Sequence, residues 1–167
     1  MSEIGRVIGR LSTAMIKSFL GPGDLAQLRR IDPLRPHCPA FWHSLTVWIA
    51  PDTTLSPDQE SRWAIILSGM ARMTGLLNLP GHPLGQALAE AGFNEGRLNR
   101  LLKVYDTAGL AVQVRRVSRF LAAAGVAVNW LDFAYFILTA DPEKREDRNR
   151  RIARDYYYSI NQKEKAR

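Results

Sequence analysis

The chain has 167 residues, which suits one domain or at most two small ones, and 46% of them are hydrophobic. Basic residues outnumber acidic ones 23 to 16, giving a net charge of +7 and a pI of about 10.0. This composition excludes wholesale disorder and favours a polyanionic partner, either nucleic acid or an anionic membrane surface. The single cysteine, Cys38, excludes an internal disulfide framework and suits a reducing cytoplasm.

Charged residues interrupt every apolar run well before the ~18 residues that a membrane-spanning helix needs. We therefore expect a cytoplasmic protein with no membrane partner. The first 20 residues lack the features of a secretory signal, although their amphipathic, basic character leaves an organellar transit peptide as an alternative.

The first half of the chain has helical spacing throughout. An N-terminal helix is predicted to end at the glycines of 21–23, and its apolar face comprises Ile4, Ile8, Leu11, Met15 and Phe19. Asp24 is typical of an N-cap and predicts a short helix through Ile31. A proline-rich loop follows at 32–39, and an apolar helix resumes at 40–49. Ser56 before Pro57 predicts the start of a helix that runs to about residue 74.

The second half continues the pattern after a loop at 76–83, where we place any subdomain boundary. A helix over Leu84–Ala91 should end at Gly92, and Asn94 should cap the next helix. That helix is expected to turn four residues inward: Leu98, Leu101, Leu102 and Tyr105. The following helix has a core stripe of Leu110, Val114, Val117 and Leu121.

Two further start signals complete the pattern. Asn129 and Asp132 resemble a capping box, and Asp141 before Pro142 opens the last helix. No strand pairs are evident. The sequence predicts an all-α, compact bundle of about eight or nine helices, with one domain over 1–160 and a charged tail at 161–167.

Signals for catalysis or cofactor binding are weak. The three histidines, His37, His43 and His82, do not share the spacing of a metal site, and the glycines form no phosphate-binding loop. His37 beside Cys38 is better explained by a packed loop than by a nucleophile and base, because adjacent side chains rarely face each other. We therefore expect no catalysis, no metal and no cofactor.

The most informative residues are basic ones without acids nearby in the sequence. Arg115, Arg116 and Arg119 crowd one helix, although like charges at helical spacing destabilise a helix. A Gln-x-Arg-Arg tetrad occurs there and again at 27–30. The candidate residues are Arg29, Arg30, Arg97, Arg100, Lys103, Arg115, Arg116 and Arg119. Two successive helices would present the last six as a joint anion-binding surface; capping of carbonyls, pairing with Asp32 or Asp106, and snorkelling are the alternatives.

The C-terminal helix carries mixed charge followed by Tyr156, Tyr157 and Tyr158. Packing in the core is expected for two of the three tyrosines. A tyrosine left free beside Arg151 and Arg154 would be able to stack on a base.

Five segments together resemble the CasB family: LAQLRRIDPL with PAFWHSL, PLGQALAEAGFNEGRLNRLL, VQVRRVSRFL, NWLDFAYFIL and EKRE. That family is the small subunit of the type I-E CRISPR Cascade complex, and the resemblance extends from about residue 25 to about residue 158. The chain departs from the family pattern at Asn129, where an aspartate is usual. An asparagine can also cap a helix.

The resemblance implies a non-catalytic helical subunit, present in two copies against the large subunit and the backbone subunits. Its basic surface would hold target DNA strands and stabilise the R-loop formed by the crRNA. The resemblance places Arg29, Arg30, Arg115 and Arg116 at basic positions of the family. It adds Arg97 and the pair Lys144 and Arg145, with Arg62 as a further candidate.

Two functions from other classes remain as alternatives. A stand-alone helix-turn-helix regulator would need base-reading residues near the start of its recognition helix, for which Asn94 and Asn99 are the candidates. An enzyme with dispersed catalytic residues would reveal itself by metal-dependent turnover.

Overall fold

The computed structural model describes residues 2–76 and 78–167, and within them it contains helices and no strand. The elements are α1 (Glu3–Ile16), α2 (Pro22–Arg30), α3 (Pro39–Ser44), a π-helical turn η1 (Leu45–Ile49), α4 (Pro57–Arg72), α5 (Leu84–Ala91), α6 (Glu95–Lys103), α7 (Thr107–Ala124), α8 (Trp130–Leu138) and α9 (Pro142–Lys165). The predicted all-α fold with eight or nine helices is confirmed. No helix of the described residues is long and apolar enough to cross a membrane.

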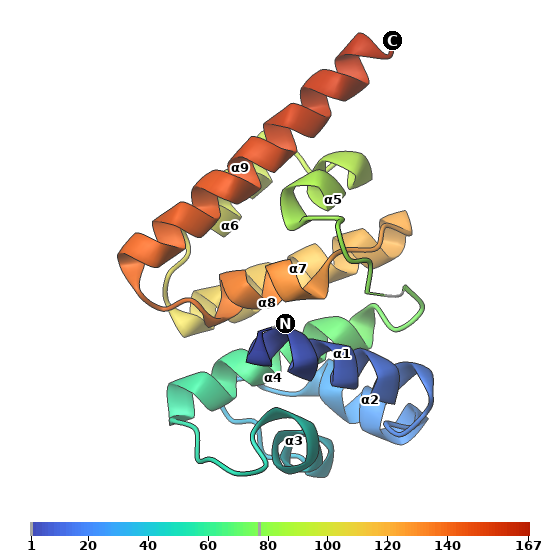
Figure 1. Ribbon diagram of the computed structural model, residues 1–167, viewed down its shortest axis with the longest axis vertical. Coiled ribbons are helices and arrows are strands. Elements are labelled where there is room, and N and C mark those ends of the chain that lie inside the picture. The colour runs from blue at the N-terminus through green and yellow to red at the C-terminus, as the bar shows by residue number, and fades with distance from the viewer. Residues whose placement is uncertain (1, 77) are drawn as a thin grey trace.

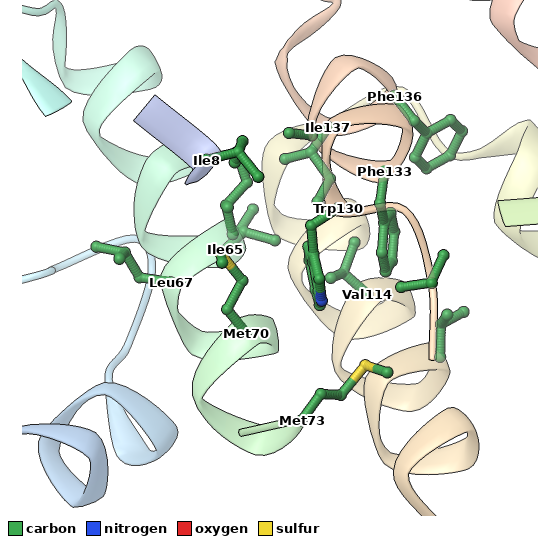
Figure 2. Close-up of a cluster of buried hydrophobic side chains, with 14 of the residues drawn as sticks. Ile8, Ile65, Leu67, Met70, Met73, Val114, Trp130, Phe133, Phe136 and Ile137 are labelled. Carbon is green, nitrogen blue, oxygen red and sulfur yellow. The ribbon is translucent and has the colours of Figure 1, made fainter. Parts of the chain in front are cut away.

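Helix α4 lies at the centre of the fold. It packs against α2, α7 and α8, while α1 covers α8 and η1 (Figure 1). Every residue from Ser61 to Ala71 is buried, as expected for a helix with neighbours on all sides. Figure 2 shows side chains of α4, α7 and α8 entering one core, among them Met70, Val114 and Trp130.

Glycine allows the closest helix contacts. A Cβ atom on Gly85 of α5 would lie 2.1 Å from the carbonyl oxygen of Ile152 in α9. The two backbones therefore approach to a distance that no side chain permits. The contact continues beyond this point, because Lys163 donates hydrogen bonds to the carbonyl oxygens of Ala89 (2.9 Å) and Glu90 (3.2 Å) at the end of α5. The last turns of α9 then extend past the other helices (Figure 1).

The predicted caps of three helices are confirmed. Ser56 accepts a hydrogen bond from the Gln59 amide at 3.2 Å, and Asn94 accepts one from the Arg97 amide at 2.9 Å. Asp141 accepts from the amide of Glu143 at 3.0 Å. Each such bond satisfies a backbone donor that the helix itself leaves unpaired, and is worth about 1 kcal/mol.

Two predictions about helix starts were wrong in detail. Asp24 is the third residue of α2, not its cap, because Pro22 begins the helix earlier; its carboxylate accepts from the Gly21 amide at 3.0 Å. Asn129 caps α8, but Asp132 does not complete a capping box. Its carboxylate instead accepts from the Leu84 amide at 2.8 Å and joins the starts of α8 and α5.

Two side chains predicted to be buried lie at the surface, because each follows the end of its helix. Helix α1 ends at Ile16, and Ser18 adopts a left-handed conformation with φ of 61°. This turn leaves Phe19 65% exposed and buries Leu20 instead. Tyr105 lies beyond the end of α6 and is 40% exposed.

Candidate nucleic-acid interface

The first of two basic grooves lies between α6 and α7. The stripe of Leu110, Val114, Val117 and Leu121 is buried as predicted, so the arginines of α7 point outward. Helix α6 adds arginines from its own exposed face. The groove has a volume of about 560 Å³, and its lining residues are Phe93, Arg97, Arg100, Gln113, Arg116, Arg119 and Phe120.

The second groove lies on the other side of α7, where α2 and α4 approach it. Its volume is about 460 Å³, and its lining residues are Arg29, Arg30, Arg72, Arg115, Arg119 and Ala122. Arg119 lines both grooves, so they form one continuous basic region. We call this region the arginine surface: Arg29, Arg30, Arg72, Arg97, Arg100, Arg115, Arg116 and Arg119.

No residue of the arginine surface forms an ion pair in the described residues, although Asp32 lines a neighbouring hollow with Arg72 and Arg115. In the described part of the chain, ion pairs join Arg62 to Asp58, His82 to Glu90 and Arg150 to Glu146, and none involves a residue of this surface. Pairing with Asp32 or Asp106 is thus not found. Asp32 accepts from the Leu34 amide, and Asp106 caps α7. Eight guanidinium groups line the two grooves with no carboxylate in either lining, and they create a positive potential that attracts anions.

Neutral acceptors hold several of these arginines in place. Arg29 donates to the carbonyl oxygen of Ala71 at 2.9 Å and to the hydroxyl of Thr74 at 3.0 Å. Arg72 donates in turn to the carbonyl oxygen of Arg29 at 2.7 Å and to Ser68 at 2.8 Å. The capping of carbonyls predicted as an alternative role therefore occurs, but it orients the guanidinium groups without neutralising them.

Sequence reasoning missed Arg72. Burial lowers its pKa to about 10, and the like charges of Arg115 and Arg119 lower the pKa in the same direction. The smaller, electrostatic part of this pKa shift shows that Arg72 lies near the cations of α7. The signal was present in the sequence, because no acidic residue lies three or four positions from Arg72 on either side.

Arg145, predicted at a nucleic-acid-binding position, is in the interior, so that prediction was wrong. Its side chain is 1% exposed, with the guanidinium carbon 3.8 Å from the ring centre of Phe136 and 5.1 Å from that of Tyr105. Its Nε donates to Asn149 at 3.2 Å. Burial lowers the pKa of Arg145 to about 10. The side chain joins α9 to α8 and cannot reach a strand outside.

Arg62 is also structural. It is 5% exposed and donates to Asp58 at 2.8 Å and to the carbonyl oxygen of Ile137 at 2.7 Å. Lys103 and Lys144 are exposed but line neither groove.

The three tyrosines of α9 differ in exposure. Tyr156 is buried and donates to the carbonyl oxygen of Phe93 at 2.6 Å. Tyr157 packs edge-on against it but remains 40% exposed, so the expected burial of two tyrosines was wrong. Tyr158 is 66% exposed, on the same face of α9 as the exposed Arg151 and Arg154.

Candidate residues for other chemistry are dispersed. Across residues 2–76 and 78–167, no three His, Cys, Asp or Glu side chains come together as a metal site would require. His43 contacts the ring of Trp48, and His37 lies 6.2 Å from the ring centre of Trp42. Asn94, a candidate base reader, uses its side chain to cap α6.

Comparison with known proteins gives a match to a family and a match to a solved structure. Residues 24–157 match the family described as CRISPR-associated protein Cse2, and this range contains the whole arginine surface. A chain in the crystal structure of E. coli Cascade bound to a PAM-containing double-stranded DNA target is 25% identical, with a TM-score of 0.69. The alignment covers 92% of this chain and 95% of that chain. A search of curated proteins gives no match.

Proposed function

This chain belongs to the Cse2 family of CRISPR-associated proteins, and we propose that its arginine surface holds a nucleic-acid strand by the phosphate backbone. Its place is in a Cascade complex, like that of the E. coli chain it resembles. Its partners there are the large subunit, the backbone subunits, a second copy of itself, the crRNA and the target DNA. The chain acts by binding and catalyses no reaction.

One observation carries the proposal: guanidinium groups from α2, α4, α6 and α7 converge with no carboxylate among them in the described residues. Their mutual repulsion destabilises the fold slightly unless an external anion neutralises it. A phosphate backbone supplies a row of anions, and arginine binds phosphate through paired donors. Phosphate contacts position a strand without reading its sequence.

The consequence in a Cascade complex is stabilisation of the R-loop. Exchange of a DNA duplex for an RNA–DNA heteroduplex is nearly balanced in free energy, so protein contacts to the strand backbone can tip it. A sequence-specific regulator is a weaker reading, since Asn94 is occupied as a cap and the exposed groups of both grooves are mainly arginines.

Binding of scrambled oligonucleotides by the isolated chain tests the proposal. We expect a Kd of about 10⁻⁴–10⁻⁶ M at physiological salt, independent of sequence. In a salt series, the log–log slope should be about 0.7–0.9 for each phosphate neutralised. Binding that ignores salt, or that selects one sequence strongly, would contradict backbone recognition.

A further inference from the structure

We propose that the α6/α7 groove accepts one unpaired nucleotide of a single strand, with its base stacked on the Arg97 guanidinium. This inference rests on the proposed function and extends it. Phosphate attraction needs only cations, whereas this groove also has an apolar floor. Because an apolar surface can contact a base, this floor allows the groove to distinguish a nucleotide from a bare phosphate.

Arg97 lies over the aromatic floor of the groove, and together they form a platform for a base. The guanidinium carbon of Arg97 lies 5.4 Å from the ring centre of Phe120. Phe120 packs edge-on against Phe93, with ring centres 5.2 Å apart and planes at 75°. Phe93 is only 4% exposed, so the core holds it in place. A guanidinium plane backed by an aromatic ring presents its outer face to a base, and arginine planes stack on bases in single-stranded recognition.

The remaining lining residues suit the other parts of a nucleotide. Arg100, Arg116 and Arg119 line the same groove and offer donors to a phosphate. The side chain of Gln113 carries both a donor and an acceptor for the edge of a base. Together, these groups can contact both the phosphate and the base of one nucleotide.

The two grooves differ in a way that supports separate roles. The described residues that line the α2/α4/α7 groove are five arginines and Ala122, with no aromatic ring. That groove is suited to backbone phosphate alone. The α6/α7 groove, at about 560 Å³, is within the ~300–1,000 Å³ that small-molecule sites usually have. A base inside a duplex stays stacked on its neighbours, so the platform favours a single strand.

The experiment compares an oligothymidylate with an abasic oligomer of equal length, which has the same phosphates but no bases. Fluorescence anisotropy on the isolated full chain should give about tenfold tighter binding for the strand with bases. Arg97→Lys keeps the charge but removes the planar group, so the advantage should disappear, while abasic binding should weaken no more than it does in Arg100→Lys. Phe120→Leu keeps an apolar residue but removes the ring, and should reduce the advantage in the same way.

Arg100→Lys is the matched control, since it makes the same substitution on α6 at a position without an aromatic ring beneath it. It should preserve the advantage. Photo-crosslinking with 5-iodouracil in the strand then locates the base, and the crosslink is expected in the α7 peptide containing Phe120. A crosslink at Tyr158 of α9 instead would place the base contact elsewhere and overturn the inference.

The outcomes separate the two proposals. If the chain binds neither oligomer, the proposed function fails. If it binds both equally with a steep salt dependence, backbone recognition stands and the nucleotide groove is wrong. An advantage that survives Arg97→Lys also contradicts the stacked geometry.

Discussion

Reversing the charge of Arg115, Arg116 and Arg119 together should weaken strand binding severely and leave the fold intact. All three are exposed, and their helix is held by the buried stripe on its opposite face. Substitution of an exposed residue usually changes stability by within about 0.5 kcal/mol. Glutamates at 115 and 119 would also replace repulsion of Arg72 by attraction. We expect the melting temperature to change by less than about 4 °C.

The effect on binding follows from the charge and from the place of these residues in the grooves. Three Arg→Glu changes alter the local charge by about six units, and Arg119 belongs to both grooves. Loss of three charge-assisted contacts, each worth about 1.5 kcal/mol before solvent screening, predicts at least about 100-fold weaker binding. The log–log salt slope should fall by about 2 to 3.

A matched control separates local charge from net charge. Reversal of Arg150, Arg151 and Arg154, all exposed on α9, changes the net charge equally but leaves the arginine surface intact. Anisotropy across a salt series and a thermal melt of both variants provide the measurements. The reasoning is refuted if the two variants weaken binding equally, or if the α7 variant no longer shows a melting transition.

Two further predictions concern the fold. Gly85→Ala would place a Cβ 2.1 Å from a backbone oxygen of α9, so it should lower the free energy of unfolding by about 1–3 kcal/mol in a chemical denaturation. Gly9→Ala is the control, because a Cβ there would have no atom within 4 Å and should not destabilise the protein. Equal effects of the two substitutions would contradict the close contact. Hydrogen bonds from Thr107 and Arg62 lower the pKa of Asp58, so its contribution to stability is complete above about pH 4 and is lost as pH falls through the lowered folded-state pKa. Asp58→Asn should therefore flatten the acid limb of a stability–pH curve relative to Asp52→Asn, and an unchanged limb would show that Asp58 is uncoupled from folding.

Much of the fold could be predicted because its signals are local. Ser56, Asn94 and Asp141 cap their helices through contacts two or three residues away, and a sequence window contains both partners. Errors arose where a distant contact decided the outcome. Asp132 was placed in a capping box but bonds the Leu84 amide, 48 positions away.

The candidate site was predictable in part for the same reason. Absence of nearby acids identified most of the arginine surface, and the spacing on α7 placed three arginines outward. The same criterion cannot reveal burial of a charge. Arg145 lies in a run of charged residues, yet it is enclosed by Phe136 and Tyr105 from two other parts of the chain. Nor does sequence spacing show that Arg72 of α4 meets Arg115 and Arg119 of α7.

The most direct test of strand holding is R-loop formation by a Cascade complex rebuilt with the variant chain. A complex carrying the reversed Arg115, Arg116 and Arg119 should load crRNA normally but form R-loops more weakly, and the defect should grow as salt rises. A complex with the α9 control variant should form R-loops like the unmodified one. Normal R-loops in the α7 variant, with the protein folded and assembled, would show that the arginine surface does not hold the strand.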